Sequence, residues 1–287
     1  MRRLNETAIL RLDRAALWNR SAPGDRQMAA KVTSDGRIVL WQGASLWAFD
    51  VLPQPVPRPN RMHSHHAFQL TLAAGGIANI RTEDRLHEGP VVLVAPDHPH
   101  SIEPEGRIAL LFVEPESRAG AGLRHLLNGR PAASLAPMPE AVAELVQLWD
   151  RPPPADDEVV RIGEQILERL LGPQEPRVAL DPRIGRVMDW LTSAGDGDVT
   201  AAKAASVACL SESRFSHLFV EETGLPFRTF VLWRRLMQAV GRAAAGESLT
   251  SAAHQAGFSD SAHFSRTFHR MFGMPADTLC LRPREDA

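Results

Sequence analysis

Three histidines and a glutamine are the side chains in the N-terminal half whose types could do chemistry. His63 and His65 lie in the run MHSHH, Gln69 follows it, and His100 closes the segment GPVVLVAPDHPH. Three imidazoles suit Zn²⁺ or Fe(II), whereas a glutamine amide is a much poorer ligand than a carboxylate. The residue types leave three interpretations open: a metal site, a polar ligand pocket that includes Gln69, or structural and surface histidines.

A second set of polar side chains lies on two segments that repeat each other. The segment FSHLFVEETGLP, from Phe215 to Pro226, recurs as FSRTFHRMFGMP from Phe264 to Pro275, with Phe, Ser, Phe, Gly and Pro in register. In each copy the two phenylalanines are four residues apart, so they share one helix face, and a glycine follows where a left-handed helix cap costs least. We predict two copies of one helical unit with their phenylalanines in a core.

Each repeated helix follows a short Ala-rich helix and a tight connection, TAAKAASVA with CLS and TSAAHQA with GFS. Small side chains let two helices cross closely, which is the helix-turn-helix pattern. The residues predicted to point outward are Ser213, Ser216 and His217 in the first copy and Ser261, Ala262, Ser265 and Arg266 in the second.

The segment between the copies, PFRTFVLWRRLMQAVGRAAAG, has apolar residues at helical spacing. About 20 helical residues span roughly 30 Å. One turn of DNA is about 34 Å. A rigid helix of this length could therefore hold two recognition helices in successive major grooves of one duplex.

The elements that would position the histidines are strands. From Gly36 to about Val113, short apolar runs are interrupted by Gly, Pro and Asp, which is typical of a sheet or barrel. Gly75 and Gly76 separate two alternating runs, and we predict a β-hairpin there. After Pro115 the apolar spacing becomes helical, and the punctuated segment GPQEPRVALDP indicates an interdomain linker.

The paired motifs resemble the DNA-binding domain of the AraC/XylS family of bacterial transcription regulators. The resemblance covers roughly Asp181 to Leu281, and its most specific part is SLTSAAHQAGFSDSAHFSRTFHRMFGMP. It departs from the family in two places, because the first recognition face lacks the usual Arg or Gln and ADTLCL lacks the usual aromatic-Arg ending. Carried over by position, the family's base-contacting sites are Ser213, Ser216, His217, Ser261, Ala262, His263, Ser265 and Arg266.

The family resemblance implies an α+β chain of two domains whose N-terminal part is a cupin-like β-barrel that senses a small ligand. In such a barrel His63, His65 and His100 would converge, and Gln69 stands near the place of the fourth ligand, a Glu in metal-binding cupins. The expected divisions are a sensor domain over residues 1–135, a helical dimerisation or packing segment over 136–172, a linker over 173–182 and an AraC-type DNA-binding domain over 183–284. The helices of the second segment could form a dimer seam or pack on the barrel.

Composition excludes several classes of protein. The chain has 287 residues, 44% of them hydrophobic and 23% charged, with a formal charge of −2, and its two cysteines are too few for a disulfide framework. We find no signal peptide or membrane span, so we expect a cytoplasmic bacterial regulator, more often an activator, without a resident cofactor unless a divalent metal occupies the barrel. The expected partners are double-stranded DNA, a small-molecule effector, a second copy of the chain as a homodimer, and RNA polymerase. The alternative hypothesis is a cupin-type metalloenzyme with a helical appendage. In such an enzyme the repeated helix-turn-helix motifs would have no role.

Overall fold

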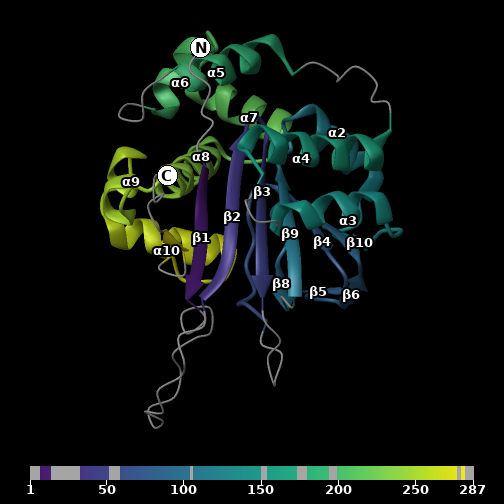
Figure 1. Ribbon diagram of the computed structural model, residues 1–287. Helices are drawn as coiled ribbons and strands as arrows, with labels where there is room; N and C mark the ends of the chain where they lie inside the picture. The colour runs from purple at the N-terminus through teal and green to yellow at the C-terminus, as the bar shows by residue number, and fades with distance from the viewer. Residues whose placement is uncertain are drawn as a thin grey trace.

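The computed structural model describes residues 7–13, 33–51, 59–103, 106–149, 154–172, 180–193, 199–276 and 279–281. Two antiparallel sheets form its N-terminal half, an eight-stranded sheet in the order β10-β7-β4-β9-β3-β2-β1-β11 and a three-stranded sheet in the order β6-β5-β8. Helices cover both faces of the larger sheet (Figure 1). The predicted α+β class with two domains is confirmed.

The strands are short and apolar, as their spacing predicts. Strands β4, β7 and most of β9 are buried at every position, because both faces of this sheet are covered by protein. The strand bounds are β1 Thr7–Asp13, β2 Thr33–Trp41, β3 Ala44–Val51, β4 Phe68–Ala73, β5 Ala78–Thr82, β6 Leu86–Gly89, β7 Val91–Val94, β8 His100–Glu103, β9 Gly106–Val113, β10 Ala132–Ser134 and β11 Leu279–Leu281.

The predicted hairpin at Gly75 and Gly76 is wrong. Strands β4 and β5 flank these glycines, but β4 pairs with β7 and β9 whereas β5 pairs with β6 and β8. Gly75 does adopt a positive φ of 96°. The paired glycines therefore let the chain turn from one sheet into the other instead of folding back on the same sheet.

One layer of helices covers one face of the larger sheet: α2 (Arg118–Leu127), α3 (Pro139–Val146), the short 3₁₀ helix η1 (Gln147–Trp149) and α4 (Asp156–Leu171). Ala141 and Leu145 of α3, like Val159 and Ile162 of α4, are fully buried in a core that they share with the strands. Of the two alternatives for these helices, packing on the sheet is the one observed. Most of the apolar residues of these helices are buried within the chain, Trp149 and Leu170 are half-buried, and homodimer formation stays a prediction.

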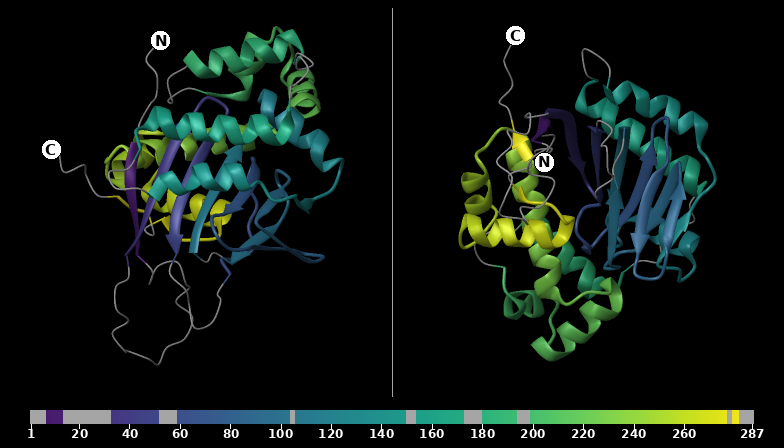
Figure 2. Two further views of the ribbon diagram at one scale, coloured as in Figure 1. Left: turned by 45° about the vertical axis from the view of Figure 1, so that its right-hand side comes forward. Right: turned by 90° about the horizontal axis from the view of Figure 1, so that it is seen from below.

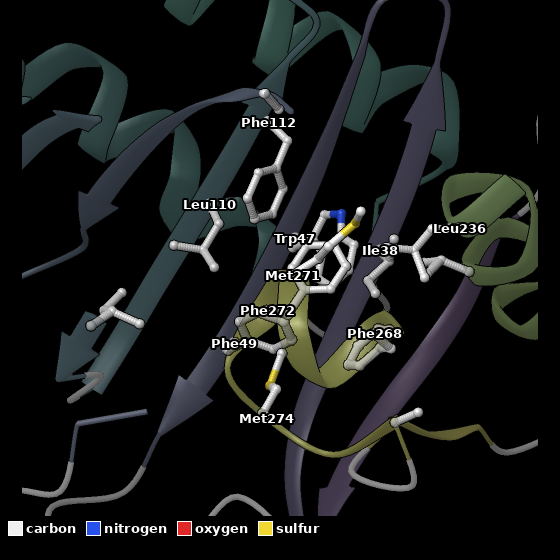
Figure 3. Close-up of a cluster of buried hydrophobic side chains, with 14 of the residues drawn as sticks. Ile38, Trp47, Phe49, Leu110, Phe112, Leu236, Phe268, Met271, Phe272 and Met274 are labelled. Carbon is white, nitrogen blue, oxygen red and sulfur yellow. The ribbon is translucent and has the colours of Figure 1, made fainter. Parts of the chain in front are cut away.

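The opposite face of the sheet is covered by the C-terminal helices α8 (Phe227–Ala244), α9 (Leu249–Gln255) and α10 (Ser261–Phe272), as the two views of Figure 2 show. A single core joins these helices to the strands. Figure 3 shows Phe268, Met271 and Phe272 of α10 packed toward Trp47 and Phe112. Strand β11, which follows α10, also pairs with β1 at the edge of the sheet.

The first repeat has a core of its own. Helices α5 (Pro182–Ser193), α6 (Ala201–Val207) and α7 (Glu212–Thr223) enclose Phe215 and Phe219 together with Phe227 and Phe230 from the first two turns of α8. We call α6–α7 the first motif and α9–α10 the second motif. The division of the chain at residues 173–182 stays a prediction, and the second motif shares its core with the sheets across that division.

A buried carboxylate lies where α8 meets the sheets. Burial raises the pKa of Glu114, the residue after β9, to about 7, and Glu116 raises it further, while Arg234 of α8 and His66 oppose the rise. The neighbouring His66 forms an ion pair with Glu116 at 2.6 Å and packs edge-on against Phe230 of α8. Charged groups from both halves of the chain therefore meet at this junction.

The two cores predict different effects of matched substitutions. Phe→Ala at a buried site costs about 3–5 kcal/mol. We expect Phe219→Ala to add a separate low-temperature transition in differential scanning calorimetry, because its core belongs to the first motif, and Phe268→Ala to shift the main transition, because its core includes the sheets. Identical thermograms for the two variants would show that the cores are not separate.

Glu114 predicts a pH-dependent stability. Its pKa in the folded chain, about 7, lies above the ordinary value of 4.5. The folded state therefore loses stability relative to the unfolded state as the pH rises from 4.5 through 7. Glu114→Gln should raise the melting temperature at pH 8 and leave it nearly unchanged at pH 5. The matched control is Glu164→Gln on the exposed side of α4, and a shift of equal size at both pH values for Glu114→Gln would contradict the prediction.

Candidate nucleic-acid interface and buried histidine cluster

The two recognition helices begin and end in the same way. The Ser211 hydroxyl caps α7 by accepting from Arg214 N, and the Asp260 carboxylate caps α10 by accepting from His263 N at 2.6 Å. Each helix ends at a glycine in the left-handed region, Gly224 and Gly273. These side-chain caps satisfy a backbone donor at each helix start, which fixes where each helix begins.

The residues predicted to contact DNA lie on the exposed sides of these helices. The phenylalanines at the inner positions, such as Phe215 and Phe264, are fully buried. Seven of the eight predicted residues are exposed, and the eighth, His263, is half-buried because its ring packs against Phe258 and lies near the Ser259 hydroxyl. The exposed residues are Ser213, Ser216, His217, Ser261, Ala262, Ser265 and Arg266. Their role as base-contacting residues stays a prediction.

Two further arginines, beyond the residues predicted from the sequence, lie on the same helices. Arg214 is exposed in the first turn of α7, and Arg270 is exposed one turn after Arg266 on α10. Residues four apart lie on one helix face, so Arg266 and Arg270 form a basic stripe. The four-residue spacing of Arg266 and Arg270 could have predicted this stripe from the sequence, because DNA phosphates need positive charge on the helix face that carries the base contacts.

Helix α8 separates the two recognition helices. Its first two turns pack with α7, and its later residues, from Trp233 to Val240, pack in the core shared with α9 and α10. Its 18 residues correspond to about 27 Å. The two motifs therefore lie toward opposite ends of a helix slightly shorter than one turn of DNA.

The predicted chemical residues of the N-terminal half lie together. His63, His65 and His100 place ring nitrogens within 4.8 Å of one another, and all three are buried. The Gln69 side-chain oxygen lies 3.0 Å from His65 Nε2 and 3.2 Å from His100 Nε2, while its nitrogen donates to Thr71 Oγ1. We call these four residues the histidine cluster. Their role stays a prediction.

The cluster is buried and uncharged. Burial is the main cause that lowers the pKa of His63 well below its ordinary value, of His65 to about 3 and of His100 to about 4, with neighbouring histidines adding repulsion. The rings are therefore neutral near pH 7, and each keeps one nitrogen lone pair. His66, next to His65 in the sequence, belongs to the junction with Glu116 instead, where its carboxylate partners raise its pKa to about 9 despite burial.

The end of α10 closes the cluster. Asn60 Nδ2 donates to Phe272 O at 2.9 Å, and Arg61 N donates to Gly273 O at 3.1 Å. A Cβ at Gly273 would lie 2.8 Å from His63 Nδ1 and 2.3 Å from Arg61 O, so only glycine fits this approach. The sequence motif did not show that the glycine cap of the second motif touches a predicted chemical residue.

Two further features are the apolar length of the helices and a surface cavity. None of the described helices is long and apolar enough to cross a membrane. A surface cavity of about 280 Å³ lies away from the cluster, lined by Arg85, Leu86, His87, Arg130, Ala133 and Ser134.

Comparison with known proteins agrees with the repeat analysis. Residues 204–279 match the family model described as a helix-turn-helix domain. None of the curated proteins compared with the chain matches it significantly in sequence.

Among solved structures, ToxT from Vibrio cholerae matches with a TM-score of 0.54 at 12% identity, over 83% of this chain and 99% of ToxT. ToxT with a bound unsaturated fatty acid matches with a TM-score of 0.54 at 14% identity, over 83% and 95% of the two chains. The AraC-like transcriptional activator CuxR matches with a TM-score of only 0.37 at 15% identity, over 77% and 90%, and we draw no structural equivalence from it. Residues 204–279 of this chain are therefore a helix-turn-helix domain, carried on a chain with the fold of ToxT.

Proposed function

We propose that the chain is a transcription regulator that binds specific double-stranded DNA sequences through α7 and α10. The observation that carries the proposal is the pair of capped recognition helices whose polar sides are exposed while their phenylalanines are buried. Side chains that read base edges must project from a rigid helix into the major groove. Both copies of the repeat meet this requirement.

The overall charge of the chain favours specific over non-specific DNA binding. The formal charge of −2 gives little general attraction to a polyanion, so affinity must come from placed groups such as Arg214, Arg266 and Arg270 and from backbone donors at helix starts. The helix-turn-helix domain indicates a regulator and not an enzyme.

We further propose that an effector held by the N-terminal sheets modulates DNA occupancy. The second motif shares a core with those sheets, so a change at the histidine cluster reaches α10 through direct contacts. Bound ligands are known for the structurally similar ToxT, one of them an unsaturated fatty acid. Activation of transcription, homodimer formation and contact with RNA polymerase stay predictions.

Selection of binding sites from random double-stranded DNA, followed by footprinting, tests the function. We expect one preferred sequence with two protected segments about one duplex turn apart. Protection without a preferred sequence would contradict the proposal.

Arg266 provides the sharpest substitution. If it contacts a guanine or a phosphate, Arg266→Ala should weaken binding to the selected site by about 1–3 kcal/mol, which is roughly 5-fold to 150-fold. His217→Ala should relax the sequence preference in the other protected segment only. The matched control is Arg124→Ala on α2, which removes the same charge from an exposed position outside both motifs. Unchanged affinity for Arg266→Ala in a gel-shift titration would remove Arg266 from the interface.

A further inference from the structure

The ring nitrogens of the histidine cluster are arranged like those of metal ligands. His63 Nδ1 lies 2.9 Å from Arg61 O, and His100 Nδ1 lies 2.8 Å from His98 O. A carbonyl oxygen only accepts hydrogen bonds, so each Nδ1 carries the proton and each Nε2 carries the lone pair. Histidines that bind metals almost always donate their second ring nitrogen to a carbonyl or carboxylate in this way, which fixes the ring and makes the other nitrogen a better ligand.

The donor atoms lie close enough together to converge on one ion, because the ring nitrogens of the three histidines are within 4.8 Å of one another. Two ligands on a first-row metal at about 2.0–2.1 Å are separated by roughly 3.0–3.4 Å. The Gln69 oxygen lies 3.0 Å from His65 Nε2 and 3.2 Å from His100 Nε2. The hydrogen bond from Gln69 to Thr71 Oγ1 holds the amide in this orientation. Three imidazoles and one amide oxygen suit Zn²⁺, Fe²⁺, Co²⁺ or Ni²⁺ better than Mg²⁺ or Ca²⁺.

The packing around the cluster leaves little space for an organic molecule. The four residues are at most 6% exposed. Aromatic rings enclose His65, with Phe112 at 5.0 Å and Trp233 and Phe272 at 6.0 Å between ring centroids. This close packing favours an occupant of the size of one ion over an organic molecule.

The same contacts connect the cluster to the second recognition helix. His63 Nδ1 donates to the carbonyl of Arg61, whose backbone nitrogen donates to Gly273 O. Asn60 lies 3.4 Å from His63 Nδ1 and also donates to Phe272 O. An ion that fixes the ring of His63 therefore fixes the segment on which the end of α10 rests.

We propose that His63, His65 and His100, with the side-chain oxygen of Gln69, bind a divalent first-row transition-metal ion, and that this ion is an effector that controls DNA binding by α10. The effector part rests on the proposed function, whereas the metal site does not. Binding the ion stabilises the docked position of α10, and release requires Phe272 and Gly273 to move away from Asn60 and Arg61.

Metal binding by the full chain is tested with Co²⁺ and Zn²⁺ alone, after removal of metals with a chelator. We expect one ion per chain, a Co²⁺ absorption spectrum typical of nitrogen ligands, and no competition from Mg²⁺. His65→Ala and His100→Ala should weaken binding on the order of 100-fold, while the exposed His125→Ala on α2 should not. Equal binding by all these variants, or none by the unaltered chain, would overturn the site.

Gln69→Glu keeps the test decisive if a histidine variant fails to fold. A carboxylate in place of the amide is a better ligand for these metals, so Gln69→Glu should bind Zn²⁺ more tightly than the unaltered chain. Unchanged or weaker Zn²⁺ binding by a folded Gln69→Glu variant would contradict a metal-ligand role for Gln69.

The connection to α10 has a matched pair of variants in the repeated glycines. Gly224 and Gly273 both have a positive φ, so alanine strains the backbone at both, but an added Cβ contacts the cluster only at Gly273 and meets nothing within 4 Å at Gly224. Gly273→Ala should release bound Zn²⁺ at least about tenfold faster than Gly224→Ala. Equal release rates would show that α10 does not close the site.

Coupling to DNA is measured with the selected site in the presence and absence of Zn²⁺. We expect saturating Zn²⁺ to change the DNA affinity at least about fivefold, and DNA to change the Zn²⁺ affinity by the same factor. His65→Ala should abolish this coupling. Metal binding without coupling would overturn the effector role and leave the proposed function intact, whereas failure to bind any DNA sequence would overturn the proposed function and leave the metal site to its own test.

Discussion

Burial of the apolar side of α10 against the N-terminal sheets holds the two halves of the molecule together. Phe264, Phe268, Met271 and Phe272 are all at most 5% exposed. Burying each such side chain contributes roughly 1.5–3 kcal/mol, so together they hold the helix firmly in place. Because α10 is amphipathic, this burial also turns Ser265 and Arg266 outward. One helix therefore contacts the histidine cluster on one side and presents the predicted DNA-binding residues on the other.

The two motifs share a sequence pattern but occupy different surroundings. The first motif encloses a core with α5 and the start of α8, and the second completes the core of the sheets. Helix α8 belongs to both cores, and Glu114 and His66 contribute charged groups where it meets the sheets. A change near His63 would thus act directly on the second motif and reach the first only through α8. This asymmetry gives an effector a physical means of altering how the two motifs are placed on one duplex.

Much of this architecture could be predicted from residue types and spacing. The phenylalanine repeat predicts both recognition helices and which of their sides are exposed, and the resemblance to a cupin barrel predicts that His63, His65 and His100 converge. The hairpin at Gly75 was wrong because a glycine pair fixes a turn but not which strands pair after it. One feature of the sequence indicates the docking of α10: the second copy has Met271 and Phe272 where the first copy has Glu222 and Thr223. Apolar residues at these positions indicate that the positions are buried, but not which element covers them. The core that α10 shares with the sheets could therefore be seen only in the structure.

Hydrogen exchange of the unaltered chain, measured by mass spectrometry without DNA, tests the shared core most directly. Amides that open only with the unfolding of a common core exchange at similar slow rates. We expect α10 to be protected to the same degree as β3 and β9, and α7 to exchange faster. Exchange of α10 at the rate of α7, with both faster than the sheet, would show that the C-terminal helices form an independent unit without a core shared with the sheets.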